Sequence, residues 1–385
     1  RDRLSPIARK VEREGTPNRR NVVLVFMESM SANLMGTFGS DKKLTPYLDS
    51  LYQQSLSFSH FYSSGIHTNH GIYSTLYSFP AIMKRNAMKG SVIPVYSGLP
   101  TVLQENGYCN LFFMTHESQY DNMNAFLRTN GFDEIYAQEN YPSEKVVNSF
   151  GVQDDFMYQY ALPILNERAG TGNPFFSVLL SISNHPPYVI PPYFHPHSDV
   201  LEEQIVEYAD WSIRQFMQAA EKQPWFDNTI FVFLGDHGKM VGTPECEMPQ
   251  SYNHIPLMIY GKDIKPGVYD GFGGQVDVSP TLLGLLNISY LQNNFGVNLL
   301  EEERPCMFFT ADNLIGARDS VNMFIYSPDS QQEFKYKLEE GKLHAATGTD
   351  EEAFRNLKDY CFSMLQSTES LVKEHKTLDK VSVKK

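Results

Sequence analysis

Three side chains that could hold a divalent cation follow two strongly apolar segments. Asp236 and His237 follow the run 229–234 after a single glycine, Gly235, and Glu28 comes directly after the run 21–27. Such runs predict buried strands of a parallel sheet. Ligands gather at the carboxyl ends of the strands in an open α/β sheet, so the three side chains are expected to meet. Two carboxylates and an imidazole are suitable ligands for a divalent metal.

A candidate nucleophile, Thr68, lies in a loop that leaves an expected strand and enters an expected helix. At a helix N-terminus, free N–H groups and the positive end of the dipole can stabilise a phosphoryl oxygen. Metal coordination would lower the pKa of the hydroxyl and make it usable as a nucleophile. Taken singly, Thr68 is equally well explained as a helix cap, and Asp236 and His237 as the end of a strand. Their combination favours a metal enzyme acting on phosphate or sulfate.

Strand-like and helical patterns alternate through about the first 290 residues, which predicts βαβ units around a mainly parallel sheet. The expected strands are 21–27, 56–62, 109–114, 175–182, 229–234 and 256–260. The expected helices are 45–55, 69–79, 100–106, 121–130, 154–168 and 200–221. After Leu300 the pattern changes to short antiparallel strands at 307–310, 323–326 and 333–337, followed by a helix at 351–366.

These patterns predict an α/β fold with a mainly parallel central sheet flanked by helices and a smaller C-terminal α+β subdomain. Residues 1–20 are expected to form a linker that follows a membrane region outside this chain, and residues 21–300 the catalytic domain. Residues 301–366 are expected to form the subdomain, and 367–385 a polar tail that frays.

The composition excludes several classes of protein. A net charge of −13 and a pI near 5.3 argue against nucleic-acid binding, which needs a basic face. No stretch approaches the roughly 18 to 20 consecutive apolar residues that a membrane span requires. A zinc knuckle is not expected, because the four cysteines are scattered and form no CxxC pair: Cys109, Cys246, Cys306 and Cys361.

Over roughly residues 20–290 the chain resembles the alkaline phosphatase superfamily, and within it the branch of lipoteichoic acid synthases and phosphoglycerol transferases, often labelled sulfatases. The resemblance rests on seven segments that occur in the family's order: 21–29, 44–51, the Thr68 loop at 63–71, 183–188, 235–238, 254–257 and 276–283.

The resemblance implies one Mn²⁺ or Zn²⁺ ion held by Glu28, Thr68, Asp236 and His237, and a covalent phospho-threonine at Thr68. A second metal stays open. His185, across the cleft, would bind phosphate or donate a proton. The family also implies a domain on the outer side of a bacterial cell membrane, anchored by an N-terminal transmembrane region. Its partners would be a phospholipid donor and a glycan or alcohol acceptor.

Other polar residues are expected beside the site. In some relatives a histidine at the position of His254 contacts phosphate or a second metal; a structural role is the equal alternative. Lipoteichoic acid synthases grip the head group with a tryptophan and an arginine, where this chain has Asp121 and Met123. This departure leaves the specificity open. His116 and Asn122 are the expected replacements, with a role as surface helix residues as the alternative. His67 flanks the nucleophile and could contact substrate, with a solvated loop histidine as the alternative.

Four other functions compete with that of a phosphoglycerol-type transferase. A sulfatase needs a cysteine or serine that matures to formylglycine, where this chain has Thr68. A two-zinc phosphatase or phosphodiesterase needs further ligands, which His185 and His254 could supply. Phosphoethanolamine transferases usually carry several disulfides. An inactive binder of glycans or lipid head groups has no reason to keep a nucleophile beside a metal site.

Overall fold

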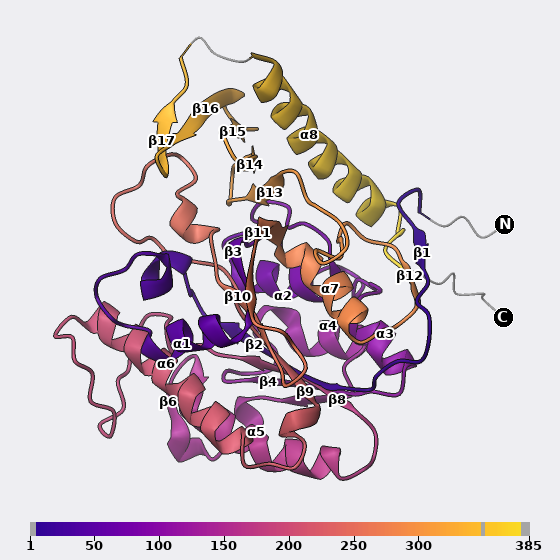
Figure 1. Ribbon diagram of the computed structural model, residues 1–385, viewed down its shortest axis with the longest axis vertical. Coiled ribbons are helices and arrows are strands. Elements are labelled where there is room, and N and C mark those ends of the chain that lie inside the picture. Colours follow the sequence, from indigo (N-terminus) through magenta and orange to yellow (C-terminus); the bar gives the residue numbers. More distant parts are fainter. Residues whose placement is uncertain (1–4, 348–350, 379–385) are drawn as a thin grey trace.

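The computed structural model describes residues 5–347 and 351–378. Its centre is an eight-stranded sheet, most of whose strands are labelled in Figure 1. β10 is antiparallel to its two neighbours and every other neighbouring pair is parallel, which confirms the expected mainly parallel sheet. The order across the sheet is β11 (Gly267–Gly274), β3 (Leu56–Tyr62), β10 (Leu257–Tyr260), β9 (Thr229–Gly235), β2 (Asn21–Met27), β8 (Phe175–Leu180), β4 (Cys109–Met114) and β5 (Glu134–Tyr136).

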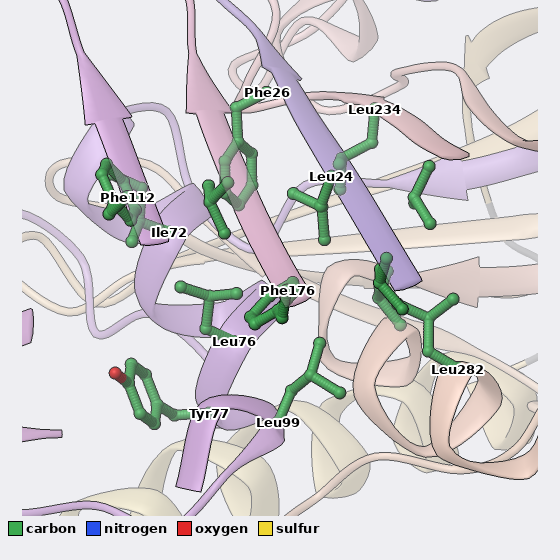
Figure 2. Packing of buried hydrophobic residues seen from close by; sticks show 14 of the residues in the cluster. Leu24, Phe26, Ile72, Leu76, Tyr77, Leu99, Phe112, Phe176, Leu234 and Leu282 are labelled. Carbon is green, nitrogen blue, oxygen red and sulfur yellow. The ribbon is translucent and has the colours of Figure 1, made fainter. Parts of the chain in front are cut away.

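Helices cover both faces of the sheet and bury its side chains. One face carries α2 (Thr68–Tyr77), α3 (Leu99–Glu105), α4 (Met123–Thr129) and α7 (Val278–Leu285). The other carries α1 (Pro46–Gln54), α5 (Asp154–Ala169) and α6 (Leu201–Ala220). Successive strand residues point to opposite faces, so Leu24 and Phe26 pack on the α2 side while Val23 and Val25 pack on the α5 side. Figure 2 shows the first of these two cores, with Leu76 of α2 among the strand side chains.

The register between β2 and β9 decides where the site forms. Met27 pairs with Gly235 at the carboxyl ends of these two parallel neighbours. Glu28 and Asp236 therefore leave the sheet side by side. β3 lies two positions from β9 in the sheet, with β10 between them, and the loop after β3 leads into α2. The three segments that carry the expected ligands thus meet at one edge, as open α/β sheets allow.

A second, antiparallel sheet and a long helix form the C-terminal part, at the top of Figure 1. Its elements are β13 (Met307–Thr310), β14 (Ile315–Arg318), β15 (Asn322–Ser327), β16 (Gln332–Glu339), β17 (Lys342–Ala345) and α8 (Glu351–Lys373). This confirms the α+β character expected after residue 300. The part is tied to the main domain, because Arg304 pairs with Asp277 and the backbone N–H of Thr310 donates to Ser64 O.

Both expected terminal segments are more ordered than the sequence suggested. Within the expected linker, β1 (Arg9–Val11) pairs with β12 (Tyr290–Gln292). The expected tail from 367 is wrong in its boundary, because α8 continues to Lys373 with Leu371 buried. Thr377 then donates to the carbonyl oxygen of Val95 at 2.6 Å. The last part of that predicted tail, 379–385, lies outside the described residues.

Several elements were not expected, and each has a weak sequence signal. β11 contains four glycines in eight residues, a composition that disfavours strands. β5 has three residues, and β14 and β17 have four each. A short hairpin of β6 (Val146–Asn148) and β7 (Gly151–Val152) was missed as well. The helix expected from 121 begins at Met123, because Asp121 and Asn122 have φ of +52° and +63°.

In the described part of the chain, no helix combines the length and the apolar character needed to span a bilayer.

Candidate functional site

Glu28, Asp236 and His237 form one compact cluster at the carboxyl ends of β2 and β9. One ligand atom from each lies within 4.8 Å of the others. His237 Nε2 is 3.6 Å from Glu28 Oε1 and 3.4 Å from Asp236 Oδ2. Both carboxylates are buried, with exposures of 1% and 0%. The structure therefore brings together the three ligands expected from the two strands.

Thr68 is the first residue of α2 and points its hydroxyl into this cluster. Thr68 Oγ1 lies 2.8 Å from Asp236 Oδ2 and 3.1 Å from Glu28 Oε2. The first backbone N–H groups of a helix have no partner within the helix, so they are available to an anion that approaches Thr68. The hydroxyl thus lies between two acidic oxygens and beside a potential phosphate-binding helix end.

Hydrogen bonds from neighbouring groups fix the orientation of each acid. The Ser29 hydroxyl donates to Glu28 Oε1 at 2.9 Å. Two backbone N–H groups, those of Ser29 and His237, donate to Asp236 Oδ1 at 2.9 and 2.8 Å. His237 Nδ1 is 2.7 Å from the carbonyl oxygen of Gly238, where a protonated Nδ1 donates. That bond leaves Nε2 directed at the carboxylates, in the orientation a metal ligand needs.

The electrostatics of the cluster call for a cation. Burial raises the pKa of Asp236 well above its ordinary value, and the Glu28 carboxylate raises it further. Burial acts in the same direction on Glu28, but His237 outweighs it and lowers the pKa of Glu28 to about 2. The carboxylates in turn raise the pKa of His237 to about 10, against the effect of burial. A positive charge is thus favoured between these groups.

The donor set fits the divalent ion implied by the family. Glu28, Thr68, Asp236 and His237 would hold it, with carboxylate, hydroxyl and imidazole donors that suit Zn²⁺ or Mn²⁺. When bound, such an ion would polarise a phosphoryl oxygen and lower the pKa of the Thr68 hydroxyl.

Gln275 connects the segments that carry the nucleophile and the acids, and sequence reasoning missed it. It is 1% exposed and its amide donates to the carbonyl oxygens of Gly235 and Asp236, at 3.1 and 2.8 Å. Its own oxygen accepts from the backbone N–H of Ser64 at 3.0 Å. A signal was available, because Gln275 directly precedes the family segment at 276–283.

A second polar network behind Glu28 also went unnoticed in the sequence. Asn184 is buried and donates to the carbonyl oxygen of Glu28 at 3.1 Å. Lys239 donates to Asn184 Oδ1 at 2.7 Å. Burial lowers the pKa of Lys239 to about 8. Asn184 and Lys239 thus support the loop that carries Glu28. The sequence drew attention to the histidines near them, His185 and His237, and not to these two residues.

Gly71 lets α2 approach the cluster, and its replacement by alanine is expected to separate them. A Cβ at this position would lie 2.2 Å from the carbonyl oxygen of Asp236. The backbone would have to move, at a cost of about 1–3 kcal/mol in the free energy of unfolding. Thr68 would move away from Asp236 with it. We expect Gly71→Ala to lower both the thermal midpoint and turnover; unchanged values in calorimetry and activity assays would contradict this close approach.

His185 and His116 lie near the cluster without touching it. The charge of His185 lowers the pKa of Glu28, after larger effects from burial, His237 and Asp236. The His185 ring contacts the Phe150 ring, with centroids 4.3 Å apart and the two planes tilted by 46°. His116 is 2% exposed, and burial lowers its pKa although the Glu28 charge opposes this. Both remain proposed substrate residues.

His67 and Asn122 make contacts that the sequence did not predict. His67 Nε2 lies 2.5 Å from Asp312 Oδ1, so the C-terminal part holds the histidine beside the nucleophile. The Asn122 amide donates to the carbonyl oxygen of Met88 at 2.7 Å. Asn122 therefore anchors the loop around Met88, while its neighbour Asp121 lies 3.4 Å from the amide of Asn69.

His254 is placed away from the acids. Its Nε2 lies 2.8 Å from the carbonyl oxygen of Ser59, and its ring stacks on Tyr62 with centroids 5.2 Å apart. Burial lowers its pKa to about 4. Among the described residues, one group of three or more acidic, histidine or cysteine side chains could hold a metal ion, and it consists of Glu28, Asp236 and His237. The structure therefore does not bring His254 to the metal cluster.

Comparison with known proteins supports the assignment of this fold. Residues 20–288 match the family model described as Sulfatase. The protein named "Lipoteichoic acid synthase-like YvgJ" of Bacillus subtilis (strain 168) is 25% identical over 324 residues, which cover 75% of this chain and 51% of that protein. Lipoteichoic acid synthase 2 of the same strain is 23% identical over 342 residues, with 79% and 51% covered. The chain thus spans about half the length of the curated relatives it matches.

Two solved structures share nearly the whole fold. A protein in the alkaline phosphatase superfamily from Vibrio parahaemolyticus is 26% identical, with a TM-score of 0.87 and coverage of 97% of this chain and 93% of that chain. The lipoteichoic acid synthase LtaP from Listeria monocytogenes is 23% identical, with a TM-score of 0.77 and 92% of each chain covered. The C-terminal sheet and α8 are therefore part of the shared architecture.

Proposed function

The chain belongs to the sulfatase family, in the lipoteichoic acid synthase-like branch of the alkaline phosphatase superfamily, and from this we propose that it is a metal-dependent phosphotransferase. It would transfer a phosphoglycerol-like group from a phospholipid to a glycan or alcohol acceptor. The observation that carries the proposal is the position of the Thr68 hydroxyl, 2.8 and 3.1 Å from oxygens of Asp236 and Glu28.

The proposed reaction has two displacement steps. In the first, Thr68 Oγ1 attacks phosphorus while its proton leaves along the hydrogen bond to Asp236, 2.8 Å away. The bond from phosphorus to the lipid alcohol breaks, and His185 supplies the proton that this alcohol needs. In the second step, the acceptor hydroxyl attacks phosphorus and gives its proton to His185. The bond from phosphorus to Thr68 breaks, and the Thr68 oxygen takes its proton back along the hydrogen bond from Asp236. The N-terminus of α2 stabilises the phosphoryl oxygens in both steps.

The site disfavours the other activities of the superfamily. A sulfatase uses a formylglycine made from cysteine or serine, and Thr68 cannot supply one. A two-metal phosphodiesterase needs a second ligand group, and His254 lies elsewhere. All four cysteines are described and free, which argues against a disulfide-rich phosphoethanolamine transferase. Hydrolysis would follow the same first step with water as acceptor, so slow phosphodiesterase activity is the second candidate function.

The proposed location follows from the relatives rather than from the chain itself. Lipoteichoic acid synthases are cell-envelope enzymes, so we place this domain on the outer side of a bacterial cell membrane. A transmembrane region would then lie in a segment of the protein outside the sequence described. The acidic net charge of −13 leaves nucleic acid out of the proposed partners.

Intact-mass spectrometry after incubation with a panel of phospholipids tests the proposal directly. We expect phosphatidylglycerol to add the mass of one glycerophosphoryl group, located at Thr68 by peptide mapping. The adduct should disappear when an acceptor alcohol is added. An adduct of phosphoethanolamine would change the donor assignment, and no adduct with any phospholipid would contradict a covalent route.

A further inference from the structure

Arg318 on β14 is a buried cation without an acidic partner. It is 7% exposed, and among residues 5–347 and 351–378 no carboxylate oxygen lies within 4.0 Å of its nitrogens. Burying an unpaired charge is costly, so buried charges in proteins are normally paired. Other arginines in this chain follow that rule: Arg20 pairs with Asp263, and Arg304 pairs with Asp277. Arg318 therefore needs another source of stabilisation.

The protein holds the Arg318 guanidinium in place but leaves donors free. Its Nη1 donates to Gln250 Oε1 at 3.2 Å, and its Nε makes a long bond of 3.4 Å to the carbonyl oxygen of Asp319. The guanidinium carbon lies 5.5 Å from the centre of the Tyr62 ring and 5.8 Å from that of Phe272. Of five N–H donors, two are used in these bonds. The two aromatic rings fix the plane of the guanidinium, and their attraction for the cation replaces only part of the stabilisation that a carboxylate would give.

A cavity of about 530 Å³ opens beside this guanidinium, between the main domain and the C-terminal sheet. Histidines and a lysine from both sides line it with Arg318: His60, His254, Lys342 and His344. One acid, Glu245, also lines it, but Glu245 Oε1 accepts the backbone N–H of Gln250 at 2.7 Å. Glu28, Thr68, Asp236 and His237 are all absent from the residues that line this cavity. It is a separate space whose cations are Arg318 and Lys342, because His254 already bonds the carbonyl oxygen of Ser59 and His60 lies 3.3 Å from Asp270.

Apolar walls complete the cavity and indicate an organic ligand. Val241, Leu338 and Leu343 line it, next to the ring of Tyr62. Its volume lies in the range of sites for small molecules and is far larger than one inorganic anion needs. The planar guanidinium of Arg318 matches the oxygens of phosphate, and the ammonium of Lys342 brings a second positive charge to the same cavity.

We propose that this cavity is a second anion site, which binds the phosphate group of an organic phosphate ester against Arg318, with the organic part against Val241, Leu338 and Leu343. The site is independent of the proposed transfer reaction. It takes its two walls from different parts of the chain, β3 on one side and β14 to β17 on the other. Binding would therefore join the C-terminal sheet more firmly to the main domain.

Calorimetric titration of the EDTA-treated full chain with phenyl phosphate tests the site apart from the metal cluster, whose bare carboxylates repel anions. We expect saturable binding, with affinity at least tenfold lower in Arg318→Met. Inorganic phosphate should bind more weakly than phenyl phosphate because it leaves the apolar wall uncovered. Competition with glycerol phosphate and with a short-chain phosphatidylglycerol then tells whether a free ester or a lipid head group is the better ligand.

Two variants keep this test interpretable. Arg128→Met removes an exposed arginine that bonds Asn124 and should bind phenyl phosphate as the unaltered chain does. Arg318→Met should keep its thermal midpoint in phosphate-free buffer, because it removes an unpaired buried charge, and should lose the rise in midpoint that the ester gives the unaltered chain. Equal affinity in Arg318→Met and the unaltered chain, tighter binding of benzoate, or failure of both natural-type esters to compete would overturn the proposal.

Discussion

We expect Thr68→Ala to lower turnover by roughly 10³-fold or more, the loss typical when a nucleophile is removed from a site whose groups act together. The variant keeps Glu28, Asp236 and His237 but has no oxygen that can form the phospho-threonine. Thr68 contributes little to the core, since it sits partly buried at the start of α2. Turnover of a phosphatidylglycerol donor and intact mass after incubation are the two measurements.

Two control variants separate loss of the nucleophile from loss of structure. Thr75→Ala changes the same residue type on the same helix, where the hydroxyl is buried without a hydrogen-bond partner, and should leave turnover nearly unchanged. Thr68→Ser keeps a hydroxyl and should recover part of the rate. Circular dichroism should give the same folded spectrum for all three. Normal turnover by a folded Thr68→Ala protein would remove Thr68 from the mechanism.

The central sheet was largely predictable because its strands carry strong local signals. β2 and β9 contain the uninterrupted apolar runs 22–27 and 230–234, and every position of both strands is buried because helices cover both faces of the sheet. Glu28 and Asp236 stand directly after those runs, so their meeting follows from the parallel register alone. The position of Thr68 required more, because it depends on how the loop after β3 crosses β10 to reach β9.

What the sequence did not reveal depends on contacts between distant segments. Gln275 binds two carbonyl oxygens on the loop of Asp236 and one N–H of Ser64, and no local pattern marks such a bridge. His254 is the first residue of the family segment 254–257, yet its imidazole contacts the carbonyl oxygen of Ser59. α8 continues beyond the expected end because Leu371 is buried by the core of the main domain. Tertiary packing decided each of these outcomes.

Removal of the metal should abolish activity as completely as removal of the nucleophile. We expect full loss of turnover in excess EDTA and recovery with Mn²⁺ or Zn²⁺, because the buried carboxylates of Glu28 and Asp236 need a cation to accept a phosphate group beside them. The metal binds the folded state, so it should also raise stability, by about 2.7 kcal/mol at roughly 100 times its Kd. Calorimetry with and without metal measures this gain, and full rates in excess EDTA would contradict the metal role.

Asp236→Asn distinguishes a metal ligand from an acid that merely supports the fold. Asp236 and Glu28 repel each other in the metal-free protein, so the neutral amide should leave the metal-free thermal midpoint unchanged or higher. The same variant should lose its activity, and the metal should no longer raise its thermal midpoint. Asp210→Asn is the matched control, since Asp210 is equally buried but binds the backbone N–H groups of Tyr47 and Leu48 on the other face of the sheet. It should keep the metal response; an equal metal-dependent rise in Asp236→Asn would show that the ion binds elsewhere.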